Sequence, residues 1–253
     1  QKLIKIMHRH KTRGFFTRQF LQSKLLPSLD YLAHAAWDSR LTTRQSYEHL
    51  FAGACGKSAM RPLTEAIRVI GLNTKQMYDN LDCVSFLMPQ LVANMAPVTL
   101  DRSPPSMVSD KVIKRFRRIG QLYGRGSRLL EEAVRLSRPA GKPLLHAMQR
   151  QAQFGHQYMR AMEARSTAIN WRCQFIEAKK QRHIHDAIKY QDTAFKWLDE
   201  AWDYYHMATQ SWADGVEDRG DLSVLACLNH YVRGAMDSIH HLASLEDSWS
   251  CLP

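Results

Sequence analysis

Apolar residues recur every three or four positions along most of the chain, which is the spacing of one face of an α-helix. Residues 58–82 keep a period near 3.6, and so do residues 109–137. The apolar positions of the second stretch are Val112, Phe116, Ile119, Tyr123, Leu130 and Val134. No alternating pattern of the kind that marks a β-strand follows residue 40. The sequence therefore predicts an all-α fold, an antiparallel bundle with long helices.

Local signals place the ends of several helices. Thr42 and Gln45 fit a capping box, which predicts a helix from there to about residue 54, after a short helix over residues 28–37. Pro143 suits the first turn of a long helix that breaks near residues 183–186. Asp186 is expected to cap a helix that runs to residue 213, and Asp221 a last helix that ends near residue 245.

Prolines divide the chain. Four of them fall within residues 83–108, so this stretch is expected to be a linker or long loop. The predicted order is a non-helical basic segment over residues 1–27 and a small helical subdomain over residues 28–82. The linker and a bundle of long helices over residues 109–253 follow.

Composition excludes several classes of protein. Hydrophobic residues make up 45% of the chain and charged residues 23%, which is typical of a globular protein. The five cysteines include no C-x-x-C pair, so neither a zinc site nor a dense disulfide framework is expected. His183 and His185 point to different faces of a helix, so we expect no metal site there. We expect no other cofactor either. No apolar run is long enough to cross a membrane, and no membrane partner is expected.

The net charge of +11 is concentrated in two segments. Residues 1–18 carry six basic residues and no acid, residues 111–128 carry seven and no acid, and residues 186–221 are acidic. One interpretation is a nucleic-acid-binding surface in the second basic segment. The other is that these are solvated helix faces, packed near the acidic helix of the same fold or near a partner domain. The nucleic-acid-binding candidates are Lys111, Lys114, Arg115, Arg117, Arg118 and Arg125.

Aromatic residues cluster in residues 195–212. Helical spacing puts Trp202 and Tyr205 on one face. Such rings commonly fill the core of a bundle. The alternative interpretation is a surface on which a sugar ring stacks, with nearby Asp and His side chains to hold its hydroxyl groups.

The stretch "GFFTRQFLQSKLLPSLDYLAHAAWDSRLTTRQSYEHLFAGACGKSA" at residues 14–59 resembles a junction in glycoside hydrolases. In alpha-glucuronidases and related polysaccharide-degrading enzymes, a (β/α)8 barrel ends there and a C-terminal helical region begins. The matching residues are Tyr31, Leu32, Ala33, Ala35, Ala36, Trp37, Asp38, Leu41, Thr42, Phe51 and Gly56.

The resemblance implies a helical accessory domain of a carbohydrate-active protein, which buttresses a barrel or completes a sugar-binding cleft. Residues 3–16 would be the tail of that barrel, and Arg13, Arg18 and Trp37 would lie at its rim. Glycoside hydrolysis usually needs two carboxylates, and no Asp or Glu precedes Asp30. We therefore expect no catalysis by this chain alone. Four partners stay open, namely carbohydrate, a preceding barrel domain, nucleic acid and a second copy of the chain. A further alternative function is a protein-interaction scaffold that binds no ligand.

Overall fold

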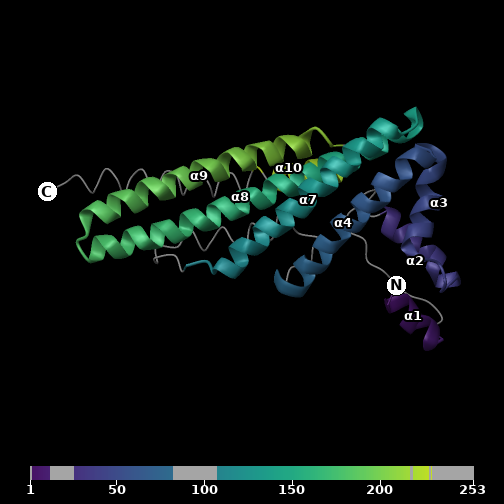
Figure 1. Ribbon diagram of the computed structural model, residues 1–253, viewed down its shortest axis with the longest axis horizontal. Coiled ribbons are helices and arrows are strands. Elements are labelled where there is room, and N and C mark those ends of the chain that lie inside the picture. Colours follow the sequence, from purple (N-terminus) through teal and green to yellow (C-terminus); the bar gives the residue numbers. More distant parts are fainter. Residues whose placement is uncertain (1, 12–25, 82–106, 217–218, 228, 230–253) are drawn as a thin grey trace. The chain divides into compact units, whose positions relative to one another are not determined.

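The computed structural model describes residues 2–11, 26–81, 107–216, 219–227 and 229. Every regular element in this part of the chain is helical, which confirms the predicted all-α fold with long helices (Figure 1). The helices are α1 (Lys2–Arg9), α2 (Leu26–Trp37), α3 (Thr43–Cys55), α4 (Lys57–Leu81), α7 (Asp110–Leu136), α8 (Lys142–Lys180), α9 (Ile184–Ala213) and α10 (Arg219–Cys227), with a short 3₁₀ helix, η2 (Pro139–Gly141).

The chain divides into two compact units, each built from two separate stretches of sequence. The first unit comprises residues 1–72 and 125–150, and the second comprises residues 73–124 and 151–253. Helices α7 and α8 each supply residues to both units. The predicted linker at residues 83–108 and the end of the predicted last helix at residue 245 lie almost wholly outside the described residues.

In the first unit, local sequence signals set the start of α3. The Thr42 side chain accepts a hydrogen bond from the Gln45 backbone N–H at 3.2 Å, and Gln45 Oε1 accepts one from the Thr42 backbone N–H at 2.9 Å. This is the predicted capping box, and it satisfies two backbone donors that have no partner within the helix. The helix then buries Phe51 and Cys55.

The prediction of a non-helical N-terminal segment was wrong for Lys2–Arg9, which form α1. Tertiary contacts support this short helix. Met7 packs against the cluster of Tyr31 and Ala35 on α2, and His8 Nε2 lies 3.0 Å from the Ala35 carbonyl oxygen. The apolar residues of Lys2–Arg9 therefore belong to a helix. Residues 12–25 lie outside the described part.

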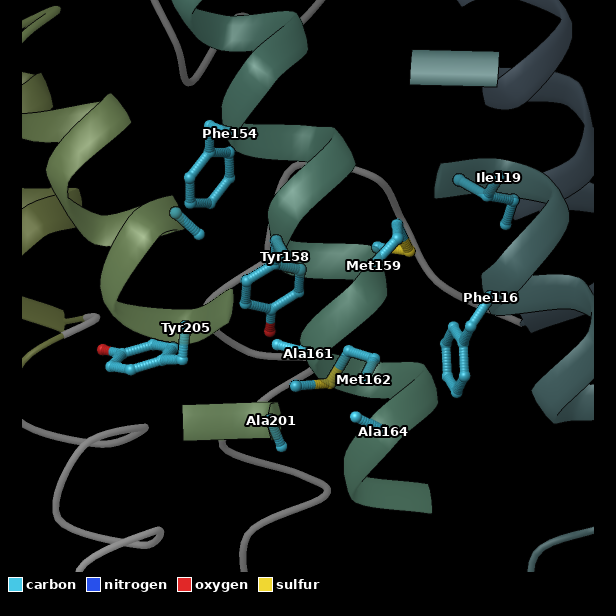
Figure 2. Packing of buried hydrophobic residues seen from close by; sticks show 11 residues of the cluster. Phe116, Ile119, Phe154, Tyr158, Met159, Ala161, Met162, Ala164, Ala201 and Tyr205 are labelled. Carbon is cyan, nitrogen blue, oxygen red and sulfur yellow. The ribbon is translucent and has the colours of Figure 1, made fainter. Parts of the chain in front are cut away.

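In the second unit, α8 packs between α7 and α9. Figure 2 shows Phe154 and Tyr158 of α8 directed toward α9, and Met159 directed toward α7. The Phe154 ring contacts Trp212 edge to face at a centroid distance of 4.9 Å. The small side chains Ala201 and Ala208 of α9 are fully buried in the same cluster, which lets the two helices approach closely.

Two helix starts in the second unit differ from the prediction. Helix α9 begins at Ile184, so Asp186 lies in its first turn and is not the cap. A carboxylate in the first turn still interacts favourably with the positive end of the helix dipole. Helix α10 begins at Arg219, two residues before the predicted cap Asp221.

Candidate functional site

The N-terminal half of α7, which belongs to the second unit, separates apolar from basic side chains. Phe116 and Ile119 are buried in the core of this unit, and Val112 and Tyr123 pack against the same cluster. Basic residues occupy the positions between them. This is the arrangement expected for an amphipathic helix whose charged face meets solvent or a ligand.

Two contacts with α8 hold this half of α7 in place. The Asn170 side chain accepts a hydrogen bond from the Val108 backbone N–H at 2.7 Å and donates one to the Val108 carbonyl at 2.8 Å. About three turns into the helix, His156 Nδ1 lies 2.7 Å from the Gly120 carbonyl oxygen. Because both contacts involve backbone atoms, they constrain this part of the chain without using its basic side chains.

Lys111, Lys114 and Arg118 form the outermost row of this surface, which we call the basic face. All three side chains are exposed, and none has an ion-pair partner among the described residues. Their spacing of three and four residues places them on one side of the helix. At a rise of 1.5 Å per residue, the row extends over about 10 Å.

Arg117 and Arg115 flank the basic face but are engaged in the fold. Arg117 Nε donates to Glu163 Oε1 at 2.6 Å, and the side chains are 51% and 7% exposed. Burying a carboxylate is costly unless it is paired, so Arg117 is needed to stabilise Glu163. Arg115 is half-buried and makes further contacts.

Arg125, the sixth predicted residue, lies in the first unit. Its Nη2 contacts Glu65 Oε1 at 2.9 Å, and Arg68 binds both oxygens of the same carboxylate at 2.7 Å. The hydrogen bonds from Arg68 lower the pKa of Glu65, with a further contribution from the positive charge of Arg125. Arg125 is therefore partly neutralised within its own unit, unlike the three residues of the basic face.

The described residues that were predicted to bind carbohydrate are divided between the two units. Tyr205 is buried in the core of the second unit, and Trp202 is half-buried beside it, with its ring 4.4 Å from that of His206. Trp37 belongs to the first unit and is 92% exposed at the end of α2. Arg13 and Arg18 lie outside the described residues.

Sequence reasoning missed a groove in the first unit, with a volume of about 1440 Å³. It exceeds the usual size of a pocket for a small molecule. Its lining mixes acids with bases that pair with them, such as Arg44 with Glu48 at 2.8 Å. No local motif signals it, because its walls come from α3, α4 and α7.

A buried hydroxyl in the second unit leads to a stability prediction. Tyr158 is fully buried on α8, burial raises its pKa, and its hydroxyl has no hydrogen-bond partner among the described residues. An unsatisfied buried hydroxyl costs about 1 kcal/mol or more. We therefore expect Tyr158→Phe to raise the free energy of unfolding by about 1 kcal/mol, measured by urea denaturation with an unchanged slope.

Tyr204→Phe is the matched control, because the Tyr204 hydroxyl accepts a hydrogen bond from Arg160 at 3.1 Å. Loss of the Tyr204 hydroxyl should leave the free energy of unfolding unchanged or lower it. A lower free energy of unfolding for Tyr158→Phe would contradict the prediction and show that the hydroxyl has a partner, such as a buried water.

Within the described part of the chain, no group of three or more His, Cys, Asp or Glu side chains is placed to hold a metal ion. In the same residues, no helix combines the length and the apolar character needed to cross a lipid bilayer. No family model, curated protein or solved structure matches this chain.

Proposed function

We propose that this protein binds nucleic acid through the basic face of α7. The observation that carries the proposal is that Lys111, Lys114 and Arg118 are aligned, exposed and without ion-pair partners among the described residues. Other arginines of the same segment, Arg117 and Arg125, form ion pairs with carboxylates of the fold. The three residues of the basic face thus retain positive charge that is available to a ligand.

The dimensions of the basic face suit a phosphate backbone. Phosphates of one DNA strand follow each other at about 3.4 Å along the helix axis. A row of about 10 Å therefore spans roughly three of them. Flexible lysine side chains act as point charges and carry no pattern that distinguishes bases, so we expect binding with little sequence preference.

The test is fluorescence anisotropy of a labelled duplex and a labelled single strand, titrated with the full chain at several salt concentrations. We expect the logarithm of the binding constant to fall linearly with the logarithm of the salt concentration, with a slope of about −3 for the duplex. Binding that is absent at low salt, or that does not respond to salt, would exclude this function.

Carbohydrate binding is the second candidate, and the exposure of Trp37 favours it. A tryptophan that is 92% exposed offers an indole face on which the apolar side of a sugar can stack. Asp38 follows it, and the Arg40 backbone N–H donates to Asp38 Oδ1 at 2.9 Å, which lowers the pKa of this carboxyl group. A carboxylate that stays ionised at the next position of the sequence can accept hydrogen bonds from sugar hydroxyls. In this proposal the chain acts as a helical accessory domain of a glycoside hydrolase-like protein.

For this second candidate, we expect Trp37→Ala to weaken retention on polysaccharide gels about tenfold or more, because one stacked aromatic ring is lost. Affinity electrophoresis through gels with and without xylan or glucuronoxylan measures the effect. The fold should be unaffected, since the Trp37 ring makes little contact with its unit. Equal migration of both proteins in all gels would remove Trp37 as a carbohydrate contact.

A further inference from the structure

The turn between α8 and α9, in the second unit, exposes two large apolar side chains side by side. Ile184 is 69% exposed and Ile188 is 53% exposed. They are four residues apart at the start of α9, so they are neighbours on one face of the helix. Figure 1 shows this turn where α8 ends and α9 begins, at the closed end of the hairpin. Two adjacent exposed apolar side chains mark a contact surface more often than a single exposed apolar side chain does.

Basic side chains surround this pair. Lys179, Lys180, Arg182 and Lys189 are all exposed, and none forms an ion pair with a described residue. The nearest acid within α9 is Asp186, which is two residues from each isoleucine and so lies on the other side of the helix. Two further exposed acids lie near the pair, Glu177 on α8 and Asp192 one turn after Ile188 on α9. The surface of the turn is therefore apolar at its centre, with four basic and three acidic side chains around it and a small net positive charge.

The backbone of the turn holds an arginine where glycine is the usual residue. The His183 N–H donates to the Ala178 carbonyl at 2.9 Å and the Arg182 N–H to the Lys179 carbonyl at 3.1 Å, which is the hydrogen-bond pattern of a Schellman motif. Arg182 occupies its left-handed position with φ 60°. Glycine at this position would keep the backbone of the turn, so Arg182→Gly removes the charge without disturbing the motif.

The turn is held by a small core of its own. Phe175, Ala178 and Ala187 are buried together, and the Tyr190 ring lies 5.6 Å from that of Trp171. Packing of these residues fixes the end of the hairpin, so the exposed isoleucines are presented from an ordered base.

We propose that the α8–α9 turn binds the surface of an anionic lipid bilayer. Ile184 and Ile188 enter the boundary between headgroups and acyl chains, while Lys179, Lys180, Arg182 and Lys189 contact the headgroups. Nucleic acid would match the positive charge but offers no apolar layer for the isoleucines. Surface binding requires no membrane-spanning helix, and it departs from the sequence-based expectation that the protein has no membrane partner.

The test is co-sedimentation of the full chain with vesicles of phosphatidylcholine alone or mixed with phosphatidylserine. We expect binding only to the mixed vesicles, weakened by salt. The double variant Ile184→Ser/Ile188→Ser should lower the partition coefficient about tenfold or more, because apolar burial is lost. Lys180→Gln/Arg182→Gly should lower the partition coefficient about 25-fold, at roughly fivefold for each basic residue near the surface.

Matched controls separate the turn from the rest of the molecule. Met207→Ser and Lys196→Gln change exposed residues of the same helix outside the turn and should leave vesicle binding unchanged. Replacement of Lys111, Lys114 and Arg118 by Gln should also leave it unchanged, so this proposal can hold or fail independently of nucleic-acid binding.

Absence of binding to the mixed vesicles would overturn the proposal, and so would equal binding by the isoleucine variant. Light scattering on the same proteins tests the other molecule that could cover the turn, a second copy of the chain. A lower molar mass of the isoleucine variant than of the unaltered protein would assign the turn to self-association and overturn lipid binding.

Discussion

Replacement of Lys111, Lys114 and Arg118 by Gln should lower the affinity for duplex DNA about 100-fold at about 0.1 M salt. Each of these side chains is expected to neutralise one phosphate and to release condensed counterions. The plot of log binding constant against log salt concentration should lose about 2.7 from its slope, at roughly 0.9 for each lost phosphate contact. Fluorescence anisotropy across a salt series measures both quantities.

A second triple variant separates the basic face from the total charge. Lys57, Arg135 and Lys142 are exposed in the first unit, and their replacement by Gln changes the net charge by the same amount. We expect it to weaken binding far less, because these residues are not on the basic face. Equal losses in both variants would contradict a local site and assign the binding to overall charge. Circular dichroism should show native helix content in each variant.

Gly141→Ala should lower the free energy of unfolding by about 3 kcal/mol, the largest stability effect that we predict. An added Cβ would lie 2.6 Å from Cys55 Sγ, 2.7 Å from Cys55 Cα and 2.7 Å from Ser137 Oγ. Backbone atoms at this distance cannot move aside as a flexible side chain does. The Arg138 N–H also donates to the Cys55 carbonyl at 3.0 Å, so η2 cannot shift without losing this bond.

Gly53→Ala is the matched control, because a Cβ at this exposed position in α3 meets no atom within 4 Å. Alanine favours a helix over glycine by about 1 kcal/mol, so this variant should be more stable than the unaltered protein. Urea denaturation measures both variants. A Gly141→Ala protein as stable as the unaltered one would show that α3 and η2 are not packed as closely as the structure has them.

The helices themselves were predictable to within a few residues where the signals are local. The apolar period of 3.6 marked α4 and α7, and the Thr42–Gln45 pair marked the start of α3. Helix α1 was missed, because eight residues carry little helical preference alone and α2 supplies the contacts that stabilise it. The αL position at Arg182 was missed because glycine, its usual marker, is absent.

Local sequence thus determined that the described part of the chain is helical, where most of its helices begin and end, and that one segment of α7 is rich in positive charge. The tertiary structure decided which of those charges are available. Glu163 lies 46 residues from Arg117 and Glu65 lies 60 residues from Arg125, yet each pair is in contact, while Lys111 has no such partner among the described residues. The tertiary structure also decided that Tyr205 is buried and Trp37 is exposed, although both are aromatic residues of helices. The physical reason is that helix formation depends on neighbours within four residues, whereas burial and ion pairing depend on which distant segments the packing brings together.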